Sequence, residues 1–159
     1  MTRAQRRWLV KSEPTTFSWQ DLWKAPRRTT SWDGVRNFQA RNYLRDEMQV
    51  GDPVFFYHSS ADPTAIMGIC EVVRAGYPDD TAFDAKSDHF DPKSDRAHPM
   101  WYMVDLRAVR PLAHPPTLAR LREERGLAKM VLLQKGSRLS VQPVTDQEWE
   151  IIERIGATG

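Results

Sequence analysis

The sequence contains very little cysteine and no long apolar run. Its one cysteine, Cys70, cannot form a disulfide within the chain, which agrees with a reducing compartment. The nearby apolar residues Ile69 and Val72 indicate a buried, inert thiol. The basic start of the chain leads into no long apolar segment, and no uncharged apolar run is long enough to cross a bilayer. We therefore expect a soluble, non-secreted protein with no membrane partner, located in the cytoplasm or nucleoid of a bacterium or in the nucleus of a eukaryote.

Signatures of nucleotide hydrolysis, nucleophilic catalysis and metal binding are also missing. The segment Lys135-Gly136-Ser137 lacks the first glycine and the spacing of a P-loop. No nucleophile stands in a Gly-x-Ser-x-Gly context. The acidic stretch 78–99 holds carboxylates and histidines, but it has neither an EF-hand glycine nor paired Cys and His spacing. We predict no metal, no cofactor and no catalytic residue.

The length of the chain predicts a single domain over residues 1–159, and its charge is unevenly distributed. Residues 1–45 carry ten Lys and Arg against three Asp and Glu, residues 46–105 carry four against twelve, and residues 106–142 carry eight against two. Arginine dominates the basic blocks, and its planar guanidinium bonds phosphates and stacks on bases. A mixed-charge surface without a ligand explains the pattern equally well. The six tryptophans favour a site for a flat ligand.

Short strands and short helices alternate along the chain. Apolar, β-branched and aromatic runs predict strands at 7–12, 50–59, 63–77, 100–112 and 137–144. Capping boxes are predicted at Ser18 with Asp21 and at Thr145 with Glu148. Together with glycines and prolines they predict helices at 18–25, 37–48, 118–126 and 146–156. The acidic stretch between the third and fourth strands has no periodicity, which indicates a long ordered loop. This order favours an α+β domain on a small curved sheet or open barrel.

Helix 37–48 raises the question of a binding site. Its apolar face carries Ala40, Tyr43, Leu44 and Met48, and helical spacing places Asn37 on the same side at the first turn. Asn37 fits an inward-pointing ligand contact, and it also fits the helix N-cap, which is the commoner use of asparagine at such a position. The sequence leaves both roles open.

Two polar triplets end apolar strands at points where site residues often lie. The first is Lys11, Ser12 and Glu13, and the second is Tyr57, His58 and Ser59. A simple exposed ion pair between Lys11 and Glu13 is an equally ordinary explanation of the first triplet.

Several segments together resemble EVE domains, in order and over nearly the whole chain. They are WLVKSEP (8–14), SWDGVRNFQARNYLR (31–45), VFFYHS (54–59), GICEVV (68–73), FDPKS (90–94), PMWYMVDL (99–106) and SRLSVQP (137–143). The resemblance implies a PUA-like fold, a curved and partly open β-barrel surrounded by short helices. It also implies kinship with YTH and SRA-type readers, which hold a modified base in an aromatic-lined pocket. The expected partner is a nucleic acid with a modified base, with 5-methylcytosine or 5-hydroxymethylcytosine in DNA preferred over RNA.

From this resemblance and the residues above we predict two groups of binding residues. The base pocket comprises Lys11, Ser12, Glu13, Trp32, Gly34, Val35, Asn37, Tyr57, His58, Ser59, Trp101, Ser140 and Gln142. The phosphate contacts comprise Arg36, Arg41 and Arg138.

Three other functions stay open at this stage. ASCH domains have a similar fold and include hydrolases of a modified cytidine, and Lys11 with Glu13 is a conceivable proton-transfer pair. Other PUA-type domains bind RNA, which the 2′-hydroxyl distinguishes from DNA. A protein-interaction domain would bind no nucleic acid at all.

Overall fold

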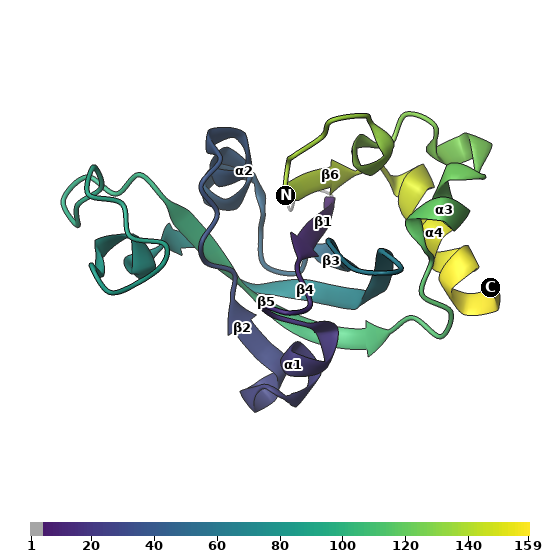
Figure 1. Cartoon of the computed structure of the whole chain (residues 1–159), viewed down its shortest axis with the longest axis horizontal. Coiled ribbons are helices and arrows are strands. Elements are labelled where there is room, and N and C mark those ends of the chain that lie inside the picture. The colour runs from purple at the N-terminus through teal and green to yellow at the C-terminus, as the bar shows by residue number, and fades with distance from the viewer. Residues whose placement is uncertain (1–4) are drawn as a thin grey trace.

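The computed structural model describes residues 5–159 and is built on one mixed sheet (Figure 1). Its strands pair in the order β2-β5-β4-β3-β1-β6. The strand bounds are β1 (Arg7–Ser12), β2 (Thr29–Ser31), β3 (Pro53–His58), β4 (Ala65–Pro78), β5 (Tyr102–Pro111) and β6 (Val141–Val144). That residues 1–159 form a single domain stays a prediction, and its first four positions lie outside the described residues.

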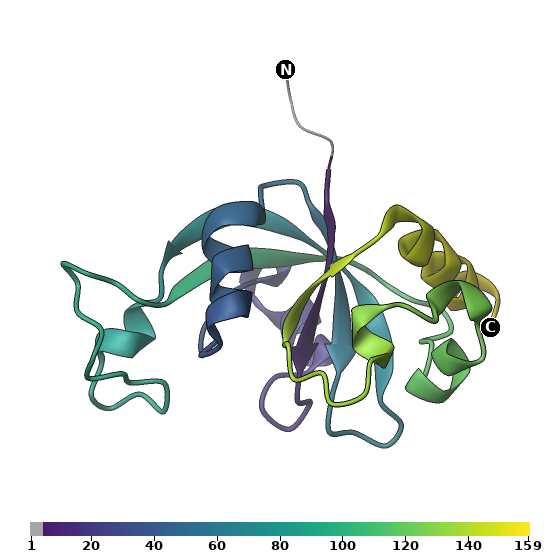
Figure 2. The ribbon, with the colours of Figure 1, turned by 90° about the horizontal axis from the view of Figure 1, so that it is seen from above.

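The sheet is curved but does not close. β1 pairs with β3 in parallel, and all other neighbouring strands are antiparallel. β2 and β6 stand at the two ends of the order, and in the described part of the chain they do not pair with each other. The long β4 and β5 pair with each other and extend to the left beyond β1 in Figure 2. The predicted α+β fold with a curved, partly open barrel is therefore confirmed.

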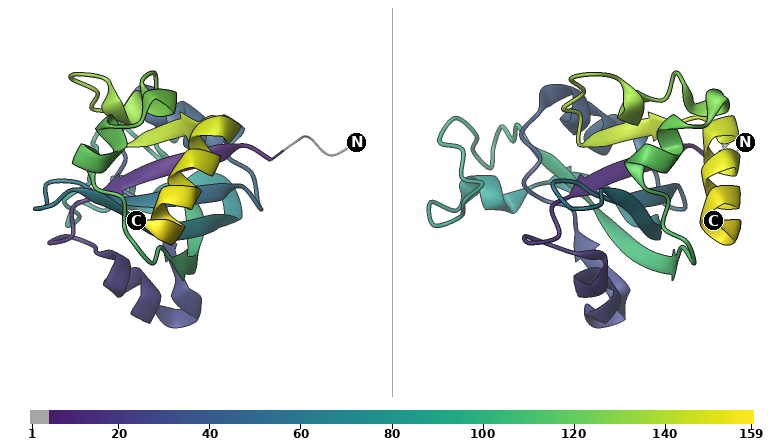
Figure 3. Two further views of the ribbon diagram at one scale, coloured as in Figure 1. Left: turned by 90° about the vertical axis from the view of Figure 1, so that its right-hand side faces the viewer. Right: turned by 45° about the vertical axis from the view of Figure 1, so that its right-hand side comes forward.

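Helices cover both faces of the sheet, and each face has its own apolar core. On one face α1 (Trp19–Lys24) and α2 (Phe38–Asn42) pack over a cluster that includes Trp8 and Phe56. On the other, α3 (Leu118–Arg122) and α4 (Asp146–Thr158) pack over a cluster that includes Leu9. Figure 3 shows α3 and α4 together, away from α1. Successive residues of a strand point to opposite faces of the sheet. Because an apolar core covers each face, β1 and β3 carry apolar residues at consecutive positions.

The predicted capping signals act as expected. The Ser18 side chain accepts a hydrogen bond from the Asp21 N–H, and the Asp21 carboxylate accepts one from the Ser18 N–H. Thr145 and Glu148 form the same reciprocal pair at the start of α4. Each pair satisfies backbone donors that the helix itself leaves unpaired.

The predicted helix 37–48 is divided in two. α2 ends at Asn42 and continues as a π-helical turn, η2 (Tyr43–Glu47), in which the Met48 N–H donates to the Tyr43 carbonyl at 2.9 Å. The predicted apolar face is nevertheless buried, since Ala40, Leu44 and Met48 are at most 2% exposed.

Other boundaries differ from the predictions because short-range signals were weak or misleading. β2 was not predicted, since a three-residue edge strand carries no periodicity of its own. The helix predicted over 118–126 ends at Arg122, and Gly126 lies in a separate 3-10 turn, η4 (Arg125–Leu127). Further 3-10 turns are η1 (Pro26–Arg28), η3 (Asp80–Phe83) and η5 (Val131–Leu133).

The predicted long loop is present as residues 79–101, an excursion that extends beyond the sheet (Figure 1). It folds back on itself through backbone hydrogen bonds, among them the Asp91 N–H to the Ala82 carbonyl at 3.0 Å. Within residues 5–159, no helix has the length and apolar character needed to span a bilayer.

Candidate functional site

The two polar triplets lie side by side because β1 and β3 are parallel neighbours. Lys11 pairs with Tyr57 and Ser12 with His58, and the Ser59 N–H donates to the Ser12 carbonyl at 2.9 Å. Paired residues of neighbouring strands point to the same face, and successive residues to opposite faces. The triplets therefore meet at one edge but serve two faces of the sheet.

Trp32 is held firmly at the end of β2. Its N–H donates to the Val104 carbonyl at 2.7 Å, and its indole is only 8% exposed. The ring meets Phe56 at a centroid distance of 5.5 Å and Phe17 at 6.5 Å, in both cases edge to face. Such contacts fix the plane of an aromatic ring. Trp32 is thus a core residue on one side and the wall of a cavity on the other.

Gly34 is required for two separate reasons. Its φ of +77° lies in the left-handed region that side chains disfavour. A Cβ at this position would also lie 2.6 Å from the His89 imidazole, so the glycine lets the loop 79–101 rest directly on the backbone. The Gly34 N–H donates to the Asp79 carboxylate at 2.8 Å. The Asp33-Gly34 turn thereby joins β2 to the distant loop.

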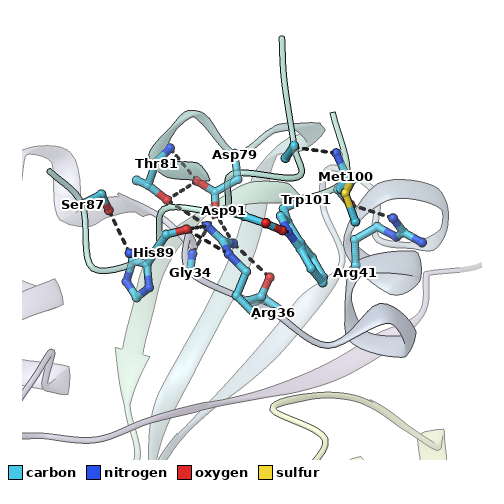
Figure 4. A network of polar contacts seen from close by, with 12 residues as sticks. Gly34, Arg36, Arg41, Asp79, Thr81, Ser87, His89, Asp91, Met100 and Trp101 are labelled. Carbon is cyan, nitrogen blue, oxygen red and sulfur yellow. Dashed lines mark hydrogen bonds and ion pairs between the residues drawn. The ribbon is translucent and has the colours of Figure 1, made fainter. Parts of the chain in front are cut away.

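A buried carboxylate anchors this loop, as Figure 4 shows. Asp79 is fully buried and bonds the Arg36 guanidinium at 3.0 Å and the Thr81 hydroxyl at 2.6 Å. Burial raises the pKa of Asp79, but the bonds from Thr81, the Gly34 N–H and Arg36 more than offset it, so the net pKa is lowered. Arg36 also donates to the His89 carbonyl at 3.1 Å. The positive charge of Arg36 is therefore already paired with a carboxylate of the protein.

These elements enclose an open cavity of about 610 Å³, which we call the Trp32 cavity. That volume lies within the range of ordinary ligand pockets. Its lining comprises Lys11, Ser12, Glu13, Thr16, Phe17, Thr30, Ser31, Trp32, Asp33, Gly34, Val35, Arg36, His89 and Ser140.

The Trp32 cavity brings together about half of the predicted pocket. Seven predicted base-pocket residues line it, and so does Arg36 from the phosphate set. The seven are Lys11, Ser12, Glu13, Trp32, Gly34, Val35 and Ser140. Tyr57 and Ser59 line a different cavity, reached from the other face of the sheet, and Lys11 lines both. The single predicted pocket is therefore two adjacent cavities that meet at Lys11.

Four predicted pocket residues line neither cavity, because other contacts hold them. Asn37 is the N-cap of α2, where its side-chain oxygen accepts from the Ala40 N–H at 2.9 Å. The residue is exposed, so of the two roles left open by the sequence the structure shows the capping one. His58 accepts from the Trp19 N–H at 3.0 Å through Nε2, and burial lowers its pKa. Asn37 and His58 therefore each accept a hydrogen bond from a backbone N–H in the first turn of a helix.

Trp101 and Gln142 are also placed elsewhere. Trp101 stacks on Phe38 with ring centroids 4.9 Å apart and donates its indole N–H to Asp91 at 2.6 Å. Gln142 pairs with Leu9, so its side chain faces the second apolar cluster. Its Nε2 donates to the Leu139 carbonyl at 2.8 Å, and its buried Oε1 has no partner in the described chain.

The remaining predicted phosphate contacts differ in their availability. Arg41 donates to the Met100 carbonyl at 2.6 Å and to Asn42 at 2.8 Å. Arg138 is exposed and forms no ion pair with any residue of the described range 5–159. Of the three predicted arginines, only Arg36 forms an ion pair within the described residues, Arg41 is held by two neutral oxygens, and Arg138 has neither kind of contact among the described side chains.

The sequence did not single out six lining residues: Thr16, Phe17, Thr30, Ser31, Asp33 and His89. Asp33 directly precedes Gly34, which was among the predicted pocket residues. Partial burial, and then the nearby Asp79 carboxylate, raise the pKa of the Asp33 carboxyl. Burial lowers the pKa of the Lys11 ammonium. Among the described residues, no group of His, Cys, Asp or Glu is arranged to hold a metal ion.

Comparison with known proteins identifies relatives over almost the whole chain. The EVE domain family model matches residues 6–155. Human thymocyte nuclear protein 1 is 40% identical over 161 residues, which span 91% of this chain and 71% of that protein. The crystal structure of human THYN1 in complex with 5-methylcytosine-containing DNA is 38% identical, with a TM-score of 0.92 over 98% of this chain and 99% of that chain.

Bacterial single-domain proteins are similar too. A crystal structure from Pseudomonas putida is 45% identical, with a TM-score of 0.90 over 94% of this chain and 99% of that chain. An ASCH protein from Zymomonas mobilis, at 9% identity and a TM-score of 0.55, shares the fold alone. The resemblance inferred from the sequence is thus confirmed, and the chain belongs to the EVE domain family.

Proposed function

We propose that this protein reads a modified cytosine in DNA, 5-methylcytosine or 5-hydroxymethylcytosine, by holding the base in the Trp32 cavity. The observation that carries the proposal is the human relative, whose crystal structure is a complex with 5-methylcytosine-containing DNA. In this chain the corresponding fold presents a cavity with an aromatic wall and several polar groups. The proposed role is binding, without chemical change to the base.

The aromatic groups offset the cost of turning a base out of a helix. Extrusion costs a few kcal/mol, and stacking on an aromatic side chain returns about 1 to 3 kcal/mol per base. Trp32 and Phe17 are the aromatic residues of the lining. Tyr57 and Trp101, which were predicted for the base pocket, lie outside this lining, so fewer aromatic rings are available for stacking than the predicted pocket contained.

Polar groups then choose the base. Burying one methyl contributes only about 0.8 kcal/mol, about fourfold in affinity, so the methyl alone gives weak discrimination. The carboxylates of Asp33 and Glu13 line the cavity, and such groups accept a hydrogen bond from the cytosine amino group. The Ser12 hydroxyl donates to the Phe17 carbonyl at 2.5 Å, which leaves its oxygen as an acceptor at the rim.

A binding panel tests the proposal. Duplexes that differ by one cytosine, 5-methylcytosine or 5-hydroxymethylcytosine are titrated with the protein, beside RNA oligonucleotides of matched sequence. We expect a lower Kd for a modified DNA than for its unmodified twin. Equal affinity for all three DNA duplexes would refute the reader function, and tighter binding to RNA would favour an RNA-binding module.

A hydrolase is the second candidate, because Lys11 and Glu13 both line the Trp32 cavity and burial lowers the pKa of the Lys11 ammonium. An amine with a lowered pKa exchanges protons more readily near neutral pH. Mass spectrometry of modified nucleosides incubated with the protein separates the two. A product that disappears in Glu13→Gln would establish turnover, and unchanged nucleosides are the result that the reader function predicts.

A further inference from the structure

A second cavity lies next to the Trp32 cavity, and Lys11 contributes to both. It encloses about 490 Å³, and we call it the Lys135 cavity. Its lining comprises Lys11, Tyr57, Ser59, Ser60, Thr64, Leu118, Arg122, Leu132, Gln134, Lys135, Gly136 and Ser137. The residues come from the end of β1, the β3–β4 connection, α3 and the segment before β6.

The charge of this lining has one sign. Lys11, Arg122 and Lys135 are its charged residues, and it contains no Asp or Glu. Within residues 5–159 none of these three forms an ion pair, and the Arg122 guanidinium makes only a long 3.4 Å contact to the Leu133 carbonyl. Uncompensated cations around a cavity favour an anionic ligand.

The neutral groups of the lining suit the same kind of ligand. Ser59, Thr64 and Ser137, which carry hydroxyl groups, line the cavity together with these cations. Gly136 has a φ of +76°, and a Cβ there would meet no atom within 4 Å, so the backbone is open to close approach. Lysine, arginine, hydroxyl and backbone N–H groups are the usual partners of phosphate oxygens in nucleic-acid complexes.

We propose that the Lys135 cavity binds the sugar–phosphate backbone of the DNA strand whose modified base occupies the Trp32 cavity; this rests on the proposed function. Lys11 lies between the two sites, and the segment 137–140 runs from Ser137 in one lining to Ser140 in the other. The exposed Arg138 stands between those two serines in the sequence. A DNA strand whose base occupies the Trp32 cavity can therefore run its phosphate backbone past these positively charged residues into the Lys135 cavity.

The test uses the double variant Arg122→Gln, Lys135→Gln. Both side chains are exposed, so the fold is expected to persist, and the thermal midpoint checks this. Kd is measured for methylated and unmethylated versions of one oligonucleotide over a range of salt concentrations. We expect both affinities to fall by the same factor, with the slope of log K against log salt reduced by about 0.7 to 0.9 for each lost phosphate contact.

The double variant Lys86→Gln, Arg154→Gln is the matched control, since it also removes two exposed positive charges, and both residues lie outside both cavities. A double variant whose affinity and salt slope match those of this control would overturn the phosphate site. So would a loss of methyl preference at an unchanged slope, which would mean that the cavity contacts the base.

The two proposals fail in different ways. A wild-type protein without preference for the methylated oligonucleotide refutes the reader function. The phosphate site still stands in that case if the double variant weakens binding to both oligonucleotides and flattens the salt dependence.

Discussion

Asp33→Asn tests which chemical group of the base the Trp32 cavity reads. Thymine carries the same methyl group as 5-methylcytosine, but it has a carbonyl acceptor where cytosine has an amino donor. The Asp33 carboxylate lines the cavity and accepts hydrogen bonds only, at any pH where it is ionised. We therefore expect the wild-type protein to favour 5-methylcytosine over thymine.

The size of that preference follows from the hydrogen bond. A bond to a charged group contributes about 1.5 to 3 kcal/mol, and Asp33 is partly exposed, so the lower end applies. About 1.5 kcal/mol is roughly a tenfold ratio of Kd values. An asparagine amide can rotate to accept from the cytosine amino group or to donate to the thymine carbonyl. In Asp33→Asn the ratio should fall toward one.

The assay is fluorescence anisotropy with single-stranded oligonucleotides that differ at one base, so that no pairing energy enters. Asp88→Asn is the control, because Asp88 is an exposed acid of the loop 79–101 that lines neither cavity. Burial and Asp79 already disfavour the Asp33 charge and raise its pKa, so Asp33→Asn should not lower the melting temperature. An unchanged ratio in Asp33→Asn would refute base reading by this carboxylate.

Three further predictions concern stability, measured by urea unfolding. Gly34→Ala should lower the free energy of unfolding by at least about 1 to 2 kcal/mol because of the positive φ at this position. Adding His89→Ala to that variant should restore only the part of the stability that is lost through the clash with the imidazole. An unchanged stability of Gly34→Ala would contradict this. Burial lowers the pKa of His58, so its stabilising contribution is present above the ordinary pKa of 6.5 and is lost as the pH falls below it. The free energy of unfolding of the wild type should therefore fall relative to that of His58→Gln below pH 6.5. Parallel curves of unfolding free energy against pH would refute this. Trp32→Ala should lower the free energy of unfolding by about 3 to 5 kcal/mol, because it truncates a core residue. The loss should be clearly larger than in the control Trp23→Ala, which truncates a half-buried tryptophan. A smaller loss than in that control would show that Trp32 is not part of the core.

Local signals in the sequence were sufficient for much of the framework. The capping pairs at Ser18 and Thr145 depend on residues three positions apart, and the structure contains both. β1 was predicted with its observed bounds, because Pro14 follows it closely and its apolar run is short. The parallel pairing of β1 with β3, which brings the two polar triplets side by side, was not predicted from the sequence.

The sequence could not show on which face of the sheet each site residue lies. Phe55, Phe56 and Tyr57 are all apolar and buried, so β3 shows no alternation that would assign Tyr57 to the face away from Trp32. Helical periodicity could not separate an inward Asn37 from a capping one, because both roles occupy the same turn. His89 enters the cavity only because the loop 79–101 folds back onto Gly34 through the buried Asp79.

The most direct measurement is a crystal structure of the protein with a short DNA duplex that contains one 5-methylcytosine. We expect the modified base to be turned out of the helix into the Trp32 cavity, with its amino group facing the Asp33 carboxylate. A modified base that remains stacked in the duplex, or that lies outside the Trp32 cavity, would contradict it.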